Sequence, residues 1–598
     1  MTNKYKEFIC NNKSNILYVF ILLSILLLIT IPKLLMQYHV GVANWDSFLY
    51  LENGRNFAKM GWGDVPSIAP VFPMMIAKLF LLAGHTYSEA IFNLDALFYI
   101  IGVIGVYLIL RFKFSNLTSL LGSMIYATFT LLYSWAAIGG NDIIGTTGTI
   151  LTIYLLLKAA GGNSKFYYLM FPIAAYSFLS RYTAGVMLFA IIFYILVNKL
   201  DMAKIKDIIV GAVIGVVSIV WFLNQFNKTL GTPFPFLGQF SGTVSNVKVM
   251  DAGFLPDSWY YINHIPNYLA STIPRGATFN ALINPMGNIP TILSTLYIIL
   301  MVAGIAAVFY KIIKTVYTSD IKFATKKNIT LTILAAVLFI VCFITICGVS
   351  YLMSSIIFMV ALLILYYVLR GYDIKYLDYD FMMILLLFVY VVFQSVIYTK
   401  NDRYFITALP FIAYFIINAI SCIYEFIDSK ISLKPKISTI ISICAVIFLV
   451  VNALSFTQSI PTENQYSDID DACNWFNENH GNYNNSTIIY SDNWPAVTWY
   501  LNLYIQRGVP ESDTPDGLAE FSKFMLCENS THSAASYYIQ TTNTDKNMTF
   551  PGFSKIYEKG TVAIYQNNYL EDHNQSQFRS SEYRNYTDNL FSNMTEEK

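Results

Sequence analysis

Charged residues are scarce in this chain of 598 residues: Asp, Glu, Lys and Arg make up only 13% of it. An ordinary soluble domain carries about 25%. The deficit is not local, because apolar runs of about 17–22 residues recur from Ile16 to Ser455, each long enough to cross about 30 Å of hydrocarbon. This pattern excludes an ordinary soluble protein, and a net charge of +1 excludes a strongly basic nucleic-acid binder.

Cysteines are also few, and the seven present form no CxxC pair and no Cys/His cluster. This argues against a zinc finger or a disulfide scaffold. Only Cys473 and Cys527 fall in the C-terminal part of the chain, where they could pair if that part lies outside the cytoplasm.

We do not expect the N-terminal segment to be a cleavable signal peptide. The apolar stretch from Ile16 to Leu35 is too long for a signal sequence, and no small-residue cleavage site follows it. Three lysines precede this stretch. We therefore expect a first transmembrane helix with its N-terminus in the cytoplasm.

The apolar runs predict a polytopic, all-α membrane protein with about thirteen transmembrane helices. We expect them near residues 15–36, 89–110, 116–137, 143–160, 166–180, 183–199, 208–226, 290–312, 329–348, 350–369, 380–398, 404–424 and 438–458. The connections on the cytoplasmic side then hold about twice as many Lys and Arg residues as the outer loops, in agreement with the positive-inside rule. An odd number of helices places the C-terminal part outside the cytoplasm. Two long loops, at about 37–88 and 227–289, share that outer face and are expected to carry recognition or chemistry.

The C-terminal part has the pattern of a small soluble α/β domain. We expect a helix at 469–479, a strand at 486–490, a helix from Pro495, a strand at 536–541, and a hairpin of 553–557 and 561–565. The chain is thus divided into a transmembrane domain (1–458), an extracytoplasmic α/β domain (459–570) and a polar, disordered tail (571–598). Sequons that a glycosylating compartment could use stand at Asn484, Asn485, Asn529, Asn547, Asn574, Asn585 and Asn593.

Two acidic residues stand out on the predicted outer face. Asp46 follows the first helix by about ten residues, where a carboxylate could accept a proton from an acceptor or hold a divalent metal. Asp142 stands where the fourth helix begins, and a charge so close to hydrocarbon usually has a task or a partner. The simpler alternatives are a solvated loop residue or helix cap for Asp46, and the N-cap of the fourth helix for Asp142.

Several cations lie on the same predicted face. Arg181 joins the fifth and sixth helices, Lys400 and Arg403 join the eleventh and twelfth, and Arg275 lies in the second long loop. Guanidinium groups suit phosphate, because their forked donors match its oxygens. The alternative is interfacial anchoring of each side chain.

The order of these segments resembles the GT-C membrane glycosyltransferases, close to the branch of protein mannosyltransferases and aminoarabinose transferases. An outer loop with an Asp, a Tyr and a Gly-x-x-Ala-like stretch leads through a Pro-rich segment into an apolar helix, and a second Asp opens the fourth helix. The segments LSRYT (Leu179 to Thr183) and DRYFITALPFIAYF (Asp402 to Phe415) follow. The resemblance covers about residues 15–425, and its order of segments carries it rather than any single motif.

The resemblance implies transfer of a sugar from a polyprenyl phosphate to an acceptor outside the cytoplasm, typically with inversion at the anomeric carbon. It implies Asp46 and Asp142 as catalytic residues, with a divalent metal between them as an option and no other cofactor. By this resemblance Arg181 and Arg403 would hold the donor phosphate, and Lys400 and Arg275 are further candidates for that role from their predicted position. Substrate-binding residues would be Tyr50, Arg55, His85, Tyr182 and Tyr404. Partners would be the lipid-linked donor, membrane lipids and a glycan, lipid or protein acceptor, in a multi-pass plasma-membrane protein that binds no nucleic acid.

Two departures bear on the acceptor. Protein mannosyltransferases usually carry an Asp-Glu pair in the first loop, whereas Asp46 is followed by Ser47. The chain also lacks the Trp-Trp-Asp-Tyr-Gly motif of oligosaccharyltransferases, which argues against transfer of a whole oligosaccharide to Asn. The sequence leaves the sugar and the acceptor open.

Two other classes of function compete with this hypothesis. A transporter or flippase of lipid-linked sugars usually shows internal repeats and charges near the membrane midplane. No clear repeat is present, and Asp95 is the main candidate for a charge inside a helix. The second alternative is a non-enzymatic membrane scaffold whose outer domain binds a partner.

Overall fold

The computed structural model describes residues 2–63, 68–198, 200–235, 237, 257–274, 276–319, 325–348, 350–397, 400–431, 435–481, 487–510, 512–526, 534–542 and 548–569. The chain forms two compact units. The first, here the helical unit, comprises residues 1–35, 95–221 and 238–461; the second, here the α/β unit, comprises 36–94, 222–237 and 462–598. Arg275, Cys527, all seven sequons and the tail 571–598 lie outside the described residues.

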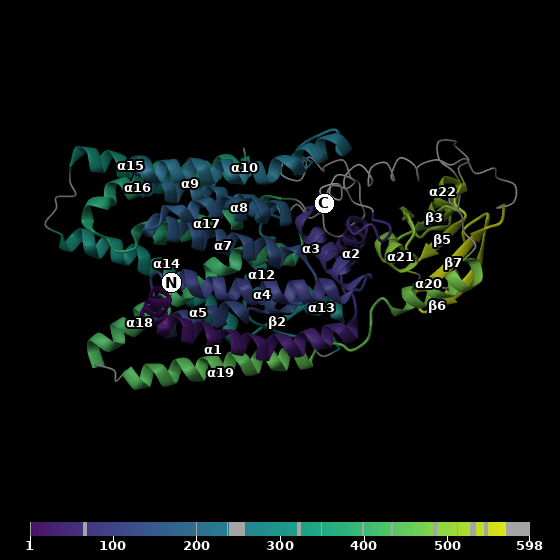
Figure 1. Cartoon of the computed structure of the whole chain (residues 1–598), viewed down its shortest axis with the longest axis horizontal. Helices are drawn as coiled ribbons and strands as arrows, with labels where there is room; N and C mark the ends of the chain where they lie inside the picture. The colour runs from purple at the N-terminus through teal and green to yellow at the C-terminus, as the bar shows by residue number, and fades with distance from the viewer. Residues whose placement is uncertain are drawn as a thin grey trace. The chain divides into compact units, whose positions relative to one another are not determined.

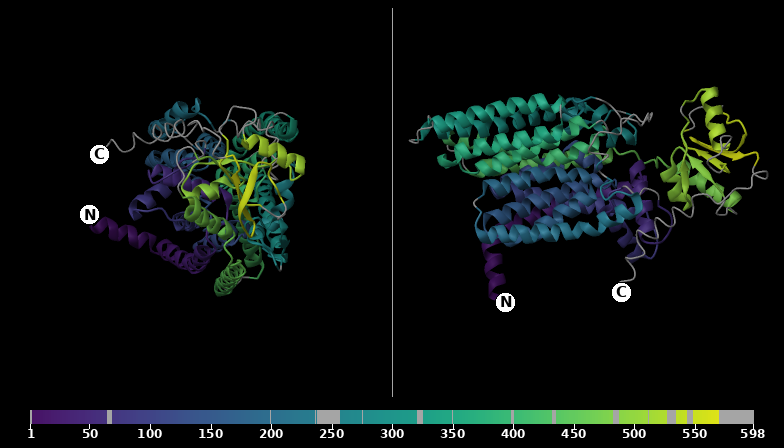
Figure 2. Two further views of the ribbon diagram at one scale, coloured as in Figure 1. Left: turned by 90° about the vertical axis from the view of Figure 1, so that its right-hand side faces the viewer. Right: turned by 90° about the horizontal axis from the view of Figure 1, so that it is seen from above.

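The helical unit contains most of the helices, and three of them, α1, α4 and α10, continue into the α/β unit. The α-helices are α1 (Thr2–Val40), α4 (Glu89–Leu110), α5 (Asn116–Ala127), α6 (Thr130–Trp135), α7 (Asn141–Gly161), α8 (Tyr167–Ser180), α9 (Leu188–Val197), α10 (Met202–Leu230), α12 (Tyr260–Leu269), α13 (Phe279–Ile283), α14 (Ile292–Thr318), α15 (Lys326–Gly348), α16 (Tyr351–Leu369), α17 (Leu377–Val396), α18 (Leu409–Ile431) and α19 (Pro435–Gln458). The 3-10 segments are η1 (Ser164–Phe166), η2 (Tyr182–Met187), η4 (Pro285–Gly287), η5 (Arg370–Tyr372) and η6 (Asp402–Ala408), and a small ladder pairs β1 (Ser271–Thr272) with β2 (Ile289–Pro290). The long helices lie side by side, with α15 against α16, α14 against α18 and α7 against α8 (Figures 1 and 2).

All thirteen expected membrane segments are helical, and ten helices of the described residues are long and apolar enough to cross a membrane. The other three expected segments are shorter or interrupted. The segment 116–137 breaks between α5 and α6, α8 has 14 residues, and 183–199 begins as the 3-10 segment η2. A multi-pass membrane protein is therefore confirmed, while the sides on which its termini lie stay a prediction.

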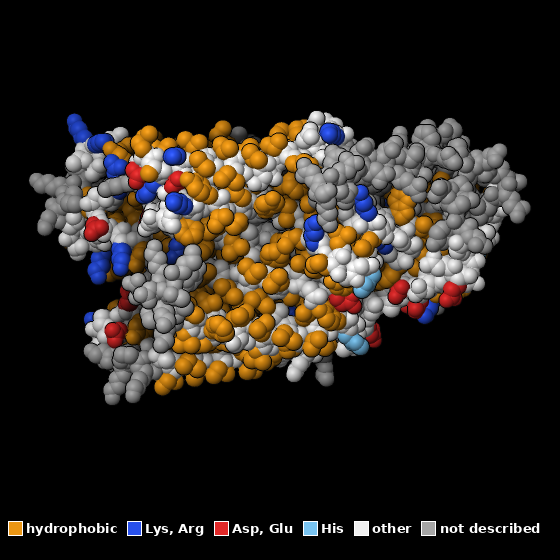
Figure 3. Space-filling model, viewed as in Figure 1, with side chains coloured by type: hydrophobic (Ala, Val, Ile, Leu, Met, Phe, Trp, Pro, Cys, Tyr) orange, Lys and Arg blue, Asp and Glu red, His pale blue; other side chains and the backbone are white. Residues whose placement is uncertain are grey.

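The flank of the helices is apolar, as hydrocarbon requires. In Figure 3 hydrophobic side chains cover the visible flank, and many of the Lys and Arg side chains gather at the left-hand end of the helices. Large apolar side chains on α10, α14, α15 and α19 are exposed, among them Ile292, Ile344 and Val451. Because these helices bury little of their surface in the protein, lipid is the solvent that their composition fits.

The α/β unit confirms the small α/β region expected near the C-terminus, and it also contains the first outer loop. Its elements are α2 (Trp45–Phe57), α3 (Val71–Ala83), α20 (Ser467–His480), β3 (Ile489–Ser491), α21 (Trp494–Leu501), β4 (Ile505–Arg507), α22 (Pro515–Leu526), β5 (Tyr537–Gln540), β6 (Phe553–Lys559) and β7 (Val562–Asn567). The strands form one sheet in the order β4-β3-β5-β7-β6, in which β3 is parallel to β4 and β5, and β7 is antiparallel to β5 and β6. The boundaries expected at residues 458 and 570 stay predictions.

A buried ion pair ties three segments of the helical unit together away from the predicted site. Lys113, between α4 and α5, pairs with Asp380 of α17, and Tyr414 of α18 donates its hydroxyl to the same carboxylate oxygen. The ammonium also lies 2.9 Å from the Tyr414 hydroxyl. Burial lowers the pKa of Lys113, and the charge of Asp380 opposes that shift.

Removing one partner of this pair is expected to be costly. Asp380→Ala leaves a buried ammonium without its carboxylate, which should lower the free energy of unfolding by roughly 3–5 kcal/mol. The measurement is the unfolding midpoint of the purified protein in detergent. The double variant Lys113→Met/Asp380→Leu removes both charges and should recover most of the loss. An Asp380→Ala protein as stable as the parent would contradict this account.

Candidate active site

Asp142 lies at the beginning of α7, buried within the helical unit. It is the second residue of the helix, and Gly140 is the N-cap, so the simpler interpretation of Asp142 as the N-cap is wrong. Its side chain is 1% exposed. A carboxylate in the first turn is stabilised by the positive end of the helix dipole, but burial this complete also requires cationic partners.

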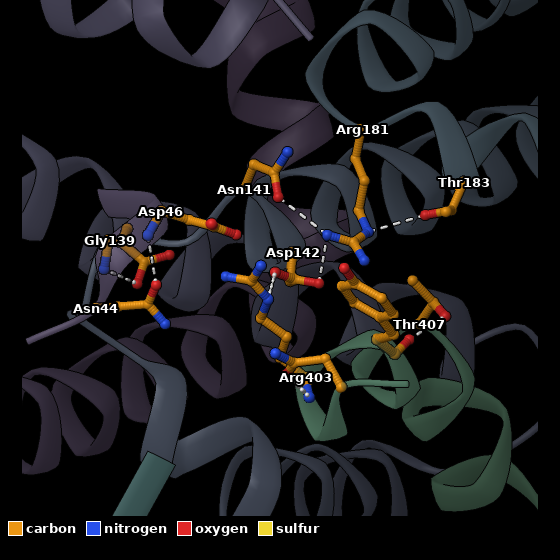
Figure 4. Close-up of polar contacts among 12 residues, drawn as sticks. Asn44, Asp46, Gly139, Asn141, Asp142, Arg181, Thr183, Arg403 and Thr407 are labelled. Carbon is orange, nitrogen blue, oxygen red and sulfur yellow. Dashed lines mark hydrogen bonds and ion pairs between the residues drawn. The ribbon is translucent and has the colours of Figure 1, made fainter. Parts of the chain in front are cut away.

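Two arginines supply those partners from distant parts of the chain. Arg181 Nη1 forms an ion pair with Asp142 Oδ1, and Arg403 Nε lies 3.5 Å from Asp142 Oδ2 (Figure 4). Arg181 also donates to Asn141 Oδ1 at 2.9 Å and to Thr183 Oγ1 at 2.8 Å. Sequence reasoning identified both arginines and the aspartate, and the structure brings the three together; Asn141 and Thr183 were missed.

Aromatic rings complete the setting of the two guanidinium groups. Arg181 lies 4.8 Å from the ring centre of Tyr404, and Arg403 lies 5.6 Å from the same ring and 5.2 Å from that of Trp135. Such contacts hold the guanidinium planes and strengthen where water is excluded. The three side chains of this Arg–Asp–Arg cluster have formal charges that sum to +1, and guanidinium groups suit an anion such as phosphate.

The backbone of α7 approaches Arg181 closely because two glycines line that face of the helix. A Cβ atom at Gly145 would lie 2.6 Å from Arg181 Cβ, and one at Gly148 would lie 2.6 Å from Ser177 Cβ. Ser177 Oγ donates to the Gly145 carbonyl at 3.0 Å. Because these two positions lack side chains, the end of α8 packs close enough to place Arg181 beside the N-terminal end of α7.

The second long loop anchors the residue next to Arg403. Asp402 Oδ1 accepts the hydroxyls of Tyr260 at 2.9 Å and Tyr268 at 2.7 Å, both from α12, and Oδ2 accepts the Met286 N–H at 3.2 Å. Both tyrosine hydroxyls have a raised pKa, first because of burial and then because of Asp402. Asp402 thus fixes the start of η6, which carries Arg403. The sequence signal was its place in the DRYF segment, but nothing there indicated its partners.

Lys400 has contacts of a different kind from those expected. Its ammonium donates to the carbonyls of Gln394, Ser395 and Ile397 at the end of α17 and lies 5.4 Å from the Tyr261 ring centre. Burial lowers the pKa of Lys400 to about 8. The contacts are those of a helix C-terminal cap, and phosphate binding by Lys400 stays a prediction.

Two further buried charges hold the turn that precedes α7. Asp95 Oδ2 accepts the Gly139 N–H at 3.0 Å, and Lys33 donates to the carbonyls of Tyr133 and Ser134, at 2.7 Å for Ser134. Gly139 has φ +99°, which glycine adopts without strain. Asp95 is thus the acidic residue inside a helix that the sequence indicated, and its contact with Gly139 supports the local backbone.

Asp46 belongs to the α/β unit, where it is the second residue of α2. The N-cap is Asn44, whose side chain accepts the Asp46 N–H at 2.8 Å, so the helix-cap interpretation of Asp46 is wrong. Both candidate acids therefore occupy the second position of a helix. Their convergence stays a prediction, because they belong to different units.

The remaining predicted substrate residues fall into different environments. Tyr182 is buried and Tyr404 is half-buried beside the arginines. Tyr50 is buried against Phe72, whereas His85 is exposed. Arg55 is buried and its donors meet backbone carbonyls. Substrate contacts of all five stay predictions.

Metal binding has no further support among the described residues. No group of three or more His, Cys, Asp or Glu side chains in that part of the chain could hold an ion. Asp142 meets two cations instead, so a divalent metal there would have to compete with the arginines. The metal-binding hypothesis for Asp46 and Asp142 stays a prediction.

A match to a family model and a match to a solved structure both support the family resemblance. Residues 64–224 match the family described as dolichyl-phosphate-mannose-protein mannosyltransferase. No curated protein sequence matches the chain significantly.

One solved structure shares the fold at low sequence identity. The structure of ArnT from Cupriavidus metallidurans bound to undecaprenyl phosphate matches with a TM-score of 0.52 and 10% identity, covering 93% of this chain and 98% of that chain. The apo oligosaccharyltransferase of Archaeoglobus fulgidus matches with a TM-score of 0.47 and 11% identity, covering 87% and 70%. The likeness to ArnT spans nearly both chains, and the expected GT-C fold is confirmed.

The close approach of α7 to Arg181 is directly testable. Gly145→Ala places a methyl group against Arg181 and should cost roughly 1–3 kcal/mol of stability, as overpacking does, while displacing the guanidinium from Asp142. Gly161→Ala on the same helix is the matched control, because a Cβ there meets nothing within 4 Å. Thermal unfolding in detergent measures both variants, and equal midpoints would contradict the close packing.

Proposed function

We propose that this protein is a glycosyltransferase that moves a sugar from a polyprenyl phosphate to an acceptor outside the cytoplasm. The observation that carries the proposal is the buried Arg181–Asp142–Arg403 cluster, whose excess positive charge suits a phosphate. The GT-C fold and the family matched by residues 64–224 support the same reaction class. The ArnT structure contains undecaprenyl phosphate, which supports a polyprenyl carrier.

The proposed reaction is a single displacement. An acceptor oxygen or nitrogen attacks the anomeric carbon, the bond between that carbon and the phosphate oxygen breaks, and polyprenyl phosphate leaves with the bonding electrons. Arg181 and Arg403 stabilise the negative charge that grows on the leaving phosphate. Asp46 accepts the proton that the acceptor loses. Asp142 would act by holding the two guanidinium groups in position.

The reaction is tested with purified protein and radiolabelled polyprenyl phosphate sugars. Transfer releases polyprenyl phosphate and labels an acceptor. Movement of the lipid-linked sugar across liposomes without transfer would instead identify a transporter or flippase. No turnover with any donor would favour a membrane scaffold.

The arginines should determine affinity for the donor. Arg181→Gln removes a charge-assisted hydrogen bond to phosphate, worth about 1.5–3 kcal/mol, so the KM for the donor should rise roughly 10- to 150-fold. Competition by undecaprenyl phosphate should weaken by the same factor. Arg370→Gln is the control, since Arg370 is an exposed residue of η5 that stacks on Tyr367. An unchanged KM in Arg181→Gln would argue against phosphate binding there.

Asp46 should determine turnover rather than donor affinity. Asp46→Asn keeps the shape of the side chain but removes its basicity, so kcat should fall to near the background rate while expression and donor binding persist. The measurement is initial rate against donor concentration. A fully active Asp46→Asn enzyme would remove Asp46 from the reaction.

A further inference from the structure

Arg55 is a buried arginine in the first outer loop, nine residues after Asp46 on α2. Its Nη1 donates to the Trp499 carbonyl and its Nη2 to the Thr498 carbonyl, both at 2.8 Å, while Nε donates to the Trp62 carbonyl at 3.2 Å. Thr498 and Trp499 both stand in the last turn of α21. The Thr498 carbonyl also accepts the N–H of the C-cap residue Asn502, and carbonyls of a last turn otherwise lack partners within the helix. Arg55 therefore caps a helix of the C-terminal domain from the first outer loop.

The guanidinium group of Arg55 contacts an aromatic ring with its face, in addition to the carbonyls that its N–H groups bind. It lies 5.0 Å from the ring centre of Trp499, and Phe80 of α3 lies 6.3 Å from the same ring. Arg55 is 3% exposed. Burial lowers its pKa to about 10, and the neighbouring charge of Glu52 opposes that shift. Its charge is thus compensated within the protein, by helix carbonyls and Glu52, rather than by solvent.

Aromatic contacts extend the same interface to the N-terminal end of α2. Trp45, directly before Asp46, packs edge-on against Trp494 with ring centres 5.3 Å apart. Phe48, two residues after Asp46, lies 4.9 Å from the ring of Tyr466 and 5.7 Å from that of Tyr500. The residues on either side of Asp46 are therefore fixed by side chains of the C-terminal domain.

The segment that follows α2 is held in the same way. The Trp62 N–H donates to Asn502 Oδ1 at 3.2 Å, and the Trp62 ring lies 6.3 Å from that of Tyr504. A Cβ at Gly61 would lie 2.0 Å from Asn502 Oδ1, so the loop passes too close for a side chain there.

We infer that the C-terminal domain, residues 459–570, contributes to catalysis because it holds α2 and so positions Asp46. Arg55 is the positioning residue where α2 meets α21. The inference rests on the proposed role of Asp46. It changes the expected role of Arg55 from substrate binding to support of the catalytic loop. It also gives the C-terminal domain a task in the reaction that does not depend on which acceptor is used.

The test separates kcat from KM in the full-length protein. Arg55→Met should lower kcat at least 10-fold while the donor KM changes less than about 3-fold, because the proposed phosphate residues belong to the helical unit. Arg55→Lys, which keeps the charge but cannot reach both carbonyls with a fork, should recover only part of the rate. Lys523→Met, an exposed cation of α22 in the same domain, is the control and should behave as the parent.

A second variant guards against loss of folding. If Arg55→Met does not accumulate in the membrane, Trp45→Leu tests the same interface, since Trp45 is 38% exposed and its removal should be tolerated. It should likewise lower kcat more than it raises KM.

The outcomes separate the inference from the proposed function. A parental kcat in the folded Arg55→Met or Trp45→Leu variant, beside an inactive Asp46→Asn enzyme, would overturn the inference and leave the glycosyltransferase proposal standing. A rise in donor KM with unchanged kcat would overturn it in favour of substrate binding by Arg55. An active Asp46→Asn enzyme would overturn the inference together with the role of Asp46.

Discussion

The helical unit depends on a carboxylate that cannot be buried without its cations. Asp142 is excluded from water at the start of α7, and the two guanidinium groups and the helix dipole help to offset the loss of hydration. Because Arg181 comes from the end of α8 and Arg403 from η6, this requirement draws three separate helices to one point. Gly145 and Gly148 permit the approach, and Asp402 fixes the neighbouring backbone through the second long loop.

Buried charged side chains also stabilise the backbone where it is irregular. Asp95 and Lys33 hold the turn before α7, and Lys400 caps the end of α17. In each case a charged side chain satisfies backbone groups that neither a helix nor lipid could satisfy. The backbone groups that these three side chains bind lie where the chain leaves a regular helix.

The helices and the C-terminal domain could be predicted because each follows from a local pattern. A long apolar run has one stable structure in lipid, and the expected strands at 486–490, 536–541 and 553–565 correspond to β3, β5, β6 and β7. The strand β4 was not predicted, because three residues are too few to show the alternation of apolar and polar side chains that indicates a strand. The partners of Arg55 were not predictable, because an arginine on an outer loop looks the same in sequence whether it meets phosphate or carbonyls. The Arg55–Trp499 contact spans 444 residues, beyond any local signal.

That separation has a consequence for how the protein matures. At a synthesis rate of about 5–20 residues per second, the α21 carbonyls emerge roughly 20–90 s after Arg55 does. Through that interval the first loop has been made but lacks the surface against which it finally packs. A nascent chain can thus insert most of its helices before Asp46 acquires its final surroundings. The surroundings of Asp46 are therefore completed only after residues 494–504 have been made.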